Sequence, residues 1–270
     1  MPRRVVIVLL QDVPWQPPGV SRERWRAALA EDMVDLAAGL AQVQAGIAAA
    51  PGDRPLAESI AWPGMPIYDV PGTSLPAVLR AAEADGYDEA VVLAPDAPDL
   101  PGLLVGKLLR PLTSRPLAVA PATIVTDSAG SGGTSAGSTD SSGETGTGET
   151  GSGESGTGET GTGETGSGES GSGATGTGET GSGETASGAD RRRGLLGVAA
   201  RLPVPPWLPD LDLDGGSPAA LRAVAPGLAD VAVTPAWRRL RGPADLATLD
   251  PAVEGWEATR ALLSGRREAG

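Results

Sequence analysis

The chain lacks cysteine, histidine, asparagine and phenylalanine, and Lys107 is the one lysine among its 270 residues. Without cysteine or histidine there can be no Ser-His-Asp triad, no cysteine nucleophile and no zinc site built from Cys and His ligands. We therefore expect no zinc and no haem, and any metal ion must be an oxygen-liganded one such as Mg²⁺ or Mn²⁺. The absence of disulfides fits a reducing cytoplasm. The many Ala, Gly, Pro and Arg residues suggest a bacterial gene of high GC content.

Long apolar runs are also missing. The run at residues 5–10 follows two arginines, but it is shorter than the roughly 7–15 residues of a signal-peptide core, and no small-residue cleavage site follows it. No stretch approaches the roughly 20 apolar residues that a membrane-spanning helix needs. The sequence therefore predicts a soluble, cytoplasmic protein with no membrane span, in which residues 5–10 form a buried strand.

Residues 127–189 consist almost entirely of Gly, Ser, Thr and Glu. A pentad, Thr/Ser-Gly-Thr/Ser-Gly-Glu, repeats there up to Glu184, with Ala174 in place of one Glu. A segment without large apolar residues cannot bury enough surface to offset the entropy cost of ordering it. The composition predicts a disordered insert. A glycosylated, mucin-like stalk is the alternative, although the insert has no proline.

The insert dominates the charge of the chain. Removing its ten acidic residues from the net charge of −13 leaves −3 for the other 207 residues, which are therefore close to balanced. The low isoelectric point gives no evidence for a cationic partner, and no basic field suited to nucleic acid is present. The remaining length is enough for one well-packed domain.

Outside the insert, strand-like and helix-like segments alternate. Strands are expected at residues 5–10, 57–62, 89–94, 116–122 and 231–234, and helices at 21–47, 74–86, 101–110, 221–224 and 253–263, while residues 194–202 follow the insert without an assigned element. In the closing helix, Trp256, Leu262 and Leu263 are expected to face the core. Such alternation indicates an α/β domain with a mostly parallel sheet covered on both faces. We expect residues 1–126 and 190–270 to be two parts of this one domain.

Two acids follow the strand at residues 89–94. In an open α/β sheet, ligands bind just beyond the carboxyl ends of the strands, and a carboxylate placed there can hold a divalent cation against nucleotide phosphates. Asp96 is therefore the candidate metal-binding acid. Asp99 is expected either to line the same site or, because Pro101 follows it, to cap the next helix.

The first loop offers a candidate anion site. Gly19 permits a ligand to approach the backbone, and the helix that Ser21 caps presents free N–H groups and a positive dipole end. Arg22 and Arg24, in the first turn of that helix, could clamp phosphate oxygens. A solvated basic turn is the alternative, although cations are disfavoured at a helix N-terminus.

Two pieces of the chain match one family pattern closely. The loop at residues 18–25 occupies the place of the family's Pro-x-Pro-Gly-x-x-Lys-Thr-Arg-Leu loop, with Arg22 where lysine is usual and Arg24 in register. The run Asp96-Ala97-Pro98-Asp99-Leu100-Pro101 is similar to Asp-Ser-Pro-Asp-Leu-Pro and is the most specific match.

A third piece, residues 190–197, is in register with Asp-Gly-Gly-Tyr-Tyr-Leu-Ile-Gly. Asp190 matches, but Arg191 and Arg192 replace the glycine pair. Glycine pairs usually let a ligand pack against bare backbone, and two arginine side chains would fill that space.

The fourth piece, residues 237–246, is similar to Trp-Tyr-Asp-Val-Asp-Thr-Pro-Glu-Asp-Leu. Trp237 matches, but Arg239 and Arg241 replace both acids of Asp-Val-Asp. This is the departure with the largest consequence, since two guanidinium groups repel a dication.

Together these pieces resemble the bacterial GT-A-like transferases grouped with radical-SAM and selenodomain proteins. Those are distant relatives of 2-phospho-lactate guanylyltransferase and of the molybdenum-cofactor nucleotidyltransferases. The resemblance implies a GT-A-like three-layer sandwich, a nucleoside triphosphate or nucleotide sugar as partner, and Mg²⁺ or Mn²⁺ beside Asp96. In the family, an acid at the position of Arg239 or Arg241 would complete the metal site, so we expect weak metal binding here.

Two functions follow from these patterns. The first is transfer of a nucleotidyl or glycosyl group, in which Arg239 and Arg241 could neutralise the leaving diphosphate in place of a full metal site. The second is a degenerate relative that binds a nucleotide without turnover, with Asp96 and Asp190 paired to Arg239 or Arg241 as a structural ion network. A role of the repeat as a tether or display segment is a third reading.

Overall fold

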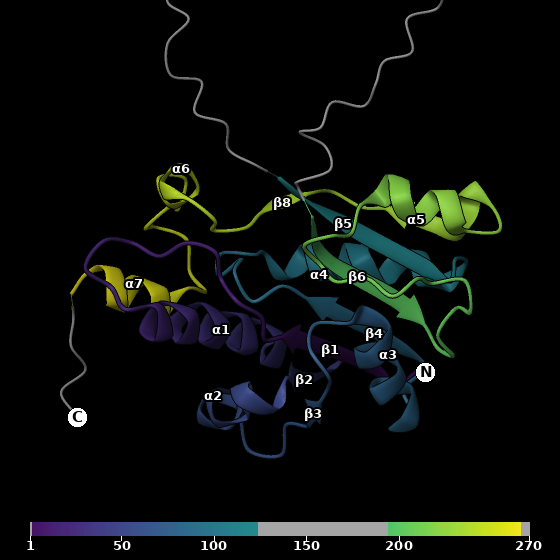
Figure 1. Ribbon diagram of the computed structural model, residues 1–270, viewed down its shortest axis with the longest axis horizontal. Helices are drawn as coiled ribbons and strands as arrows, with labels where there is room; N and C mark the ends of the chain where they lie inside the picture. The colour runs from purple at the N-terminus through teal and green to yellow at the C-terminus, as the bar shows by residue number, and fades with distance from the viewer. Residues whose placement is uncertain (1, 124–193, 266–270) are drawn as a thin grey trace, which may run out of the picture. The chain divides into compact units, whose positions relative to one another are not determined.

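A computed structural model describes residues 2–123 and 194–265 of the chain. The predicted insert at 127–189, Asp190 and the arginines that follow it lie outside the described residues. Residues from both described ranges contribute strands to the same sheet (Figure 1).

The sheet has eight strands, in the order β3-β2-β1-β4-β6-β5-β7, with β8 paired to β5 beside this path. Only β6 runs antiparallel to its described neighbours, β4 and β5. The sheet is therefore mostly parallel, as the sequence predicts. The strands are β1 (Arg4–Leu9), β2 (Gln44–Ala49), β3 (Ile67–Asp69), β4 (Glu89–Leu93), β5 (Leu117–Thr123), β6 (Leu195–Arg201), β7 (Val231–Val233) and β8 (Trp237–Arg238).

Helices cover both faces of the sheet. They are α1 (Arg22–Ala38), α2 (Arg54–Ile60), α3 (Leu75–Ala84), α4 (Gly102–Leu109), α5 (Pro218–Val224), α6 (Pro243–Leu246) and α7 (Glu257–Leu263), with short 3₁₀ turns at Pro51–Asp53, Arg110–Thr113 and Leu228–Asp230. Within the described part of the chain, no helix is long and apolar enough to cross a membrane.

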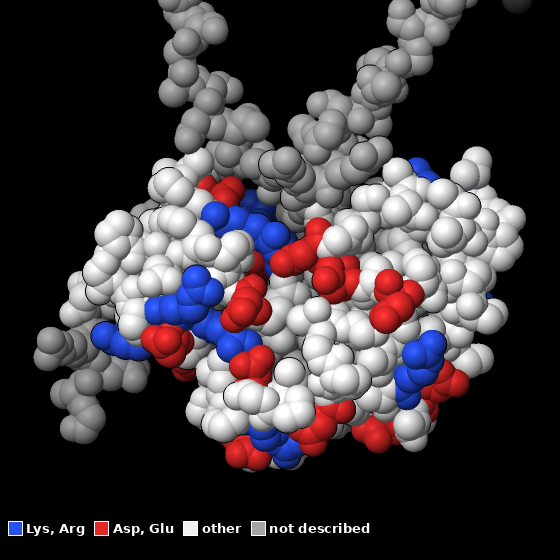
Figure 2. All heavy atoms as spheres, in the orientation of Figure 1, with Lys and Arg blue, Asp and Glu red and all other residues white. Residues whose placement is uncertain are grey.

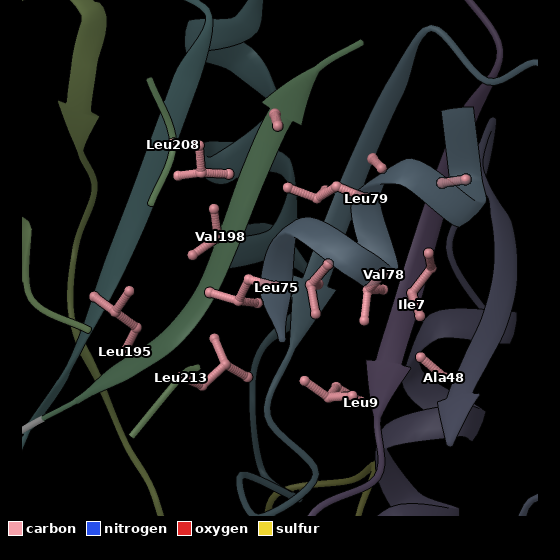
Figure 3. Close-up of a cluster of buried hydrophobic side chains, with 14 of the residues drawn as sticks. Ile7, Leu9, Ala48, Leu75, Val78, Leu79, Leu195, Val198, Leu208 and Leu213 are labelled. Atoms are coloured by element: carbon pink, nitrogen blue, oxygen red, sulfur yellow. The ribbon is translucent and has the colours of Figure 1, made fainter. Parts of the chain in front are cut away.

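The core consists of two apolar layers, because side chains along a strand point alternately to opposite faces. In β1, Ile7 and Leu9 face one layer together with Leu75 and Leu79 of α3 (Figure 3). The intervening Val8 faces the other layer, which α1, α2 and α4 cover. A helix layer, a sheet and a second helix layer form the three-layer α/β sandwich that the sequence predicts.

The predicted helix at 21–47 is wrong beyond its first half. Helix α1 ends at Ala38 with Gly39 as its C-cap residue, and Gln42 turns the chain with a φ of 65°. Residues 44–49 then form β2, a strand of mostly small residues. Val43 and Ile47 are four positions apart, a spacing that is also typical of one face of a helix. A strand rich in Ala and Gly is hard to recognise, because both residues have a low propensity for strands.

Two further predictions need correction. The predicted strand at 57–62 lies instead in α2 and the turn after it; Pro55 is in the first helical turn, where its missing N–H costs nothing. The closing helix begins only at Glu257, after the buried Trp256, and its Leu263 is exposed rather than facing the core.

Strand order changes direction between β1 and β4. From β1 the chain crosses through α1 to β2 on one side, whereas β4, reached through α3, pairs with β1 on the other side. In open α/β sheets, ligands bind at the carboxyl ends of the strands where the order reverses in this way. Gln11 follows β1 closely and Asp96 follows β4 closely, so both lie at this edge.

Candidate functional site

Four charged side chains meet at the carboxyl edge of β1 and β4. They are Asp96 after β4, Asp214 from the loop before α5, and Arg239 and Arg241 from the segment after β8. Figure 2 shows acidic and basic side chains gathered next to one another on this face, near β8 and α6 in the orientation of Figure 1. The sequence singled out three of these four residues, and the structure brings those three together.

Asp96 is completely buried and uses both carboxylate oxygens. Its Oδ1 accepts from Nε of Arg239 at 2.5 Å, and its Oδ2 accepts from Nε of Arg241 at 3.3 Å. The Arg239 side chain is 1% exposed and that of Asp96 is 0% exposed. The backbone is joined as well, because the N–H of Leu240 donates to the carbonyl of Asp96 at 2.7 Å.

Arg239 crosses the site to the strand next to β4. Its Nη1 donates to the carbonyl oxygen of Leu195 in β6 at 3.0 Å and to Oδ1 of Asp214 at 2.7 Å. Burial lowers the pKa of Arg239, but the charges of Asp96 and Asp214 outweigh that effect and raise it, so the guanidinium stays charged.

Asp214 lies at the exposed rim of this cluster, with 44% of its side chain accessible. Its Oδ1 accepts hydrogen bonds from Arg239, from Nη2 of Arg241 and from Nε2 of Gln11. Burial alone would raise the pKa of Asp214, but the guanidinium groups of Arg239 and Arg241 hold it below its usual value.

Helix α1 also places at this edge Arg26, an arginine that the sequence did not single out. Nε of Arg26 donates to the carbonyl of Gln11 at 3.0 Å, and its two Nη atoms each lie 2.6 Å from an oxygen of Asp53. This fork locks the end of β1 to the turn after β2. The hydrogen bond to Asp53 raises the pKa of Arg26, and burial, which lowers it, offsets this rise only in part.

Ser21 caps α1 as predicted, with its hydroxyl accepting from the backbone N–H of Arg24 at 3.3 Å. Gly19 has a φ of 81°, a conformation that favours glycine, and an added Cβ would meet nothing within 4 Å. The side chains of Arg22 and Arg24 are exposed in the first turn. Their role in anion binding remains a prediction.

Asp99 is not the cap of α4. That helix has Pro101 as its N-cap residue and no side-chain cap. The carboxylate of Asp99 instead pairs with the guanidinium of Arg238 and accepts from Nε1 of Trp237 at 3.3 Å. Burial raises the pKa of Asp99, and these two partners offset that rise only in part. This pair fastens β8 to the loop after β4.

The glycine of the third matched piece has a packing reason. Gly197 in β6 lies opposite Leu93 of β4. A Cβ there would approach the carbonyl oxygen of Val92 to 2.9 Å and Cδ2 of Leu93 to 2.7 Å. A larger residue would therefore push β6 away from β4 at the edge that carries Asp96.

These residues do not fit a divalent cation. Among residues 2–123 and 194–265, no three Asp or Glu side chains come together as a metal site needs. Asp96 would have to exchange two guanidinium bonds for one ion, and Arg239 and Arg241 would repel that ion at short range.

The sequence reasoning missed Gln11, Arg26, Asp53 and Asp214. Asp214 precedes Gly215 and Gly216, a combination that marks a turn and gives a weak signal. Gln11 directly follows the first apolar strand, so the rule applied to Asp96 would have found it. Arg26 and Asp53 give no signal of their own, because each becomes informative only through the other.

The described hollows lie elsewhere. One of about 890 Å³ is a groove between α1 and α7, lined in part by Arg24, Glu257 and Arg260, and another of about 490 Å³ lies between α3 and the residues after β6. Neither includes Asp96 or Arg239.

No protein-family model matches the chain, and no curated protein matches its sequence. Its structure is similar to that of a protein from Desulfovibrio desulfuricans G20 described as a nucleotide-diphospho-sugar transferase, with a TM-score of 0.53 and 15% identity over 98% of this chain and 96% of that one. The chain has a GT-A-like fold. At this identity the likeness concerns the fold alone.

Other solved structures match a smaller part of the chain. CMP:2-keto-3-deoxy-manno-octonic acid synthetase complexed with CTP has a TM-score of 0.35 and 14% identity over 46% of this chain and 54% of its own. Glucosyl-3-phosphoglycerate synthase from Mycobacterium tuberculosis, in complex with Mg²⁺ and uridine-diphosphate, has a TM-score of 0.31 and 14% identity over 44% of this chain and 43% of its own.

Proposed function

We propose that this chain is a cytoplasmic, nucleotide- or nucleotide-sugar-binding protein of GT-A-like fold that has no metal-dependent turnover. One observation carries the proposal: both carboxylate oxygens of the buried Asp96 are bonded to Arg239 and Arg241. The acid that would hold a metal ion beside phosphate is thereby neutralised. A nucleotide is the ligand that we propose for the carboxyl edge of β1 and β4, because the guanidinium groups gathered there are good partners for phosphate.

Displacement of an arginine from Asp96 by a metal ion is energetically unfavourable. Removing one partner from a buried ion pair costs about 3–5 kcal/mol, because it leaves an uncompensated charge. A cation that displaced Arg239 would meet that cost in addition to its own dehydration, and Mg²⁺ dehydrates reluctantly. Binding through the arginines requires no such exchange.

The test is calorimetric titration of the protein with GTP, CTP, UTP and UDP- or GDP-sugars, each with and without Mn²⁺, followed by a search for released diphosphate. We expect at least one ligand to bind with the same affinity in both conditions and no diphosphate release. Transfer or hydrolysis that needs Mn²⁺, and that Asp96→Asn abolishes, would overturn the proposal.

A second candidate is a transferase in which an arginine neutralises the leaving diphosphate directly. The observation in its favour is the partial exposure of Arg241, whose side chain is 25% accessible whereas that of Arg239 is 1% accessible. Preorganised charge at the leaving group can by itself accelerate transfer at phosphorus. Turnover that persists in EDTA and disappears in Arg241→Gln would establish this function. Arg222→Gln, which changes an exposed arginine of α5, is the matched control.

A further inference from the structure

One carboxylate oxygen in this site has three donors. Oδ1 of Asp214 accepts from Nε2 of Gln11 at 3.0 Å, from Nη1 of Arg239 at 2.7 Å and from Nη2 of Arg241. These donors come from the end of β1 and from the segment after β8, which are more than 200 residues apart along the chain. Donors that converge on one negatively charged oxygen form the arrangement by which proteins hold oxyanions.

The two arginine donors have other partners besides Asp214. Nε of Arg239 and Nε of Arg241 are bonded to Asp96, and Nη1 of Arg239 also donates to the carbonyl of Leu195. Nη2 of Arg239 is buried and has no hydrogen-bond partner among the described residues, so the site holds one more donor than it uses. The backbone of Gln11 is bonded to Arg26.

Asp214 is the most exposed member of the cluster. Its side chain is 44% exposed, in contrast to the buried Asp96 and Arg239. The backbone beside it is fixed, because the N–H of Leu195 donates to the carbonyl of Leu213 at 2.6 Å, and a Cβ on Gly216 would approach Leu195 to 2.7 Å. The carboxylate can therefore leave by rotation of its own side chain.

Charge favours an anion in its place. Asp96, Asp214, Arg239 and Arg241 are together neutral, so rotation of Asp214 into solvent leaves the other three with one net positive charge. A phosphate oxygen can accept the same three hydrogen bonds and restore neutrality. A dication bound there would instead add to the positive charge of Arg239 and Arg241.

We propose that Gln11, Arg239 and Arg241 form a phosphate subsite, and that the carboxylate of Asp214 occupies it until a diphosphate group displaces it. Asp214 thus acts as an internal competitor that weakens binding of the free anion. This inference deepens the proposed function, on which it rests, by naming the part of the nucleotide that the site binds.

The experiment uses the full chain and inorganic pyrophosphate as the probe, with calorimetry for wild type, Asp214→Ala, Asp214→Asn and Asp214→Ala/Arg241→Gln. We expect Asp214→Ala to bind pyrophosphate at least about tenfold more tightly than wild type, since it removes a competing charge. Asp214→Asn, which keeps the size of the side chain, should lie between the two. The double variant should lose the gain.

Asp210→Ala is the matched control: this acid lies in the same loop, but it accepts from Ser74 rather than from the arginines. It should bind pyrophosphate as wild type does. If Asp214→Ala does not fold, Asp214→Asn decides the question by the same comparison. Equal affinity of wild type, the folded Asp214 variant and Asp210→Ala would overturn the inference.

The two proposals can fail separately. If Asp214→Ala binds pyrophosphate more tightly but neither protein binds any nucleotide, the subsite stands and the proposal of a nucleotide ligand is overturned. If the protein binds a nucleotide but Asp214→Ala strengthens neither nucleotide binding nor pyrophosphate binding, the proposed function stands and the subsite is overturned.

Discussion

Arg239 and Asp96, separated by 143 positions in the sequence, form an ion pair that is shielded from solvent at the carboxyl edge of the sheet. A pair in this position is strongly coupled to the fold, because each partner is the main compensation for the other's buried charge. The same pair determines what the site can bind, so stability and ligand chemistry are linked here.

The first prediction concerns that link. Arg239→Met should lower the free energy of unfolding by about 3–5 kcal/mol, since it leaves Asp96 and a buried cluster without its central cation. Urea unfolding followed by circular dichroism measures the loss. Arg22→Met, a change of the same type at an exposed position, should cost no more than about 0.5 kcal/mol. A comparable small loss for both variants would show that the buried pair is not important for stability.

The second prediction is weak or undetectable Mn²⁺ binding by the unmodified protein, because Asp96 faces two guanidinium groups. Replacing Arg239 and Arg241 together by Asp changes the local charge by four units and should create or strengthen divalent binding. Titration of Mn²⁺ into both proteins, with circular dichroism to check that the variant folds, tests this. Tight, stoichiometric binding by wild type that Asp96→Asn abolishes would contradict the charge argument.

The third prediction concerns Arg22 and Arg24, which follow Gly19 at the start of α1. If they bind phosphate, changing both to Gln should remove measurable affinity for nucleotide or pyrophosphate and leave the unfolding midpoint unchanged. Calorimetry before and after the change gives the answer. Unchanged affinity would identify this turn as a solvated basic surface, with Arg26 as the arginine that supports the site.

The fourth prediction is a dependence of stability on pH through Asp32. This buried acid of α1 accepts from the backbone N–H groups of Ala258 and Thr259, at 2.8 and 2.9 Å, in the first turn of α7. Burial raises its pKa from 3.8 to about 6, although the bonds from Thr259 and Ala258 oppose the rise.

Because the folded pKa lies above the unfolded one, the contribution of Asp32 to stability is fully present below about pH 4 and is lost as the pH rises through 6. The whole change is on the order of 3 kcal/mol. The difference in unfolding free energy between wild type and Asp32→Asn, measured from pH 4 to 7.5, isolates this group from the other acids. A difference that stays constant with pH would count against the raised pKa.

The fifth prediction concerns domain organisation. We propose that residues 1–126 and 190–270 form one domain interrupted by the repeat. A chain in which a short Gly/Ser linker joins Thr126 to Asp190 should unfold cooperatively with a nearly unchanged melting temperature, because closing a long flexible loop costs little more than closing a short one. Differential scanning calorimetry provides the measurement. An aggregated or non-cooperative product would show that the insert takes part in the fold.

The sequence by itself determined the elements whose signal is local. Strands β1 and β4 are continuous apolar runs that no solvent-exposed segment would carry, and Ser21 and Ser74 cap their helices through side-chain contacts within three residues. The α/β class and the position of Asp96 beyond β4 follow from these elements. Strand β2 did not reveal itself in this way, because its small residues are selected by the close packing of its neighbours: a Cβ at Gly46 would lie 3.1 Å from the Tyr68 ring.

Only the tertiary structure decided which residues of the site form hydrogen bonds and ion pairs with one another. The partners of Asp96, the three donors on Asp214 and the Arg26–Asp53 fork join segments that are 25 to 203 positions apart. A charged residue that becomes buried needs a partner of opposite charge, but the sequence does not show which residue that partner is. Strand order determines which charged residues meet, because it brings the ends of β1, β4 and β8 to one edge. Hydrophobic periodicity, which reports only which side of an element is covered, carries no information about that order.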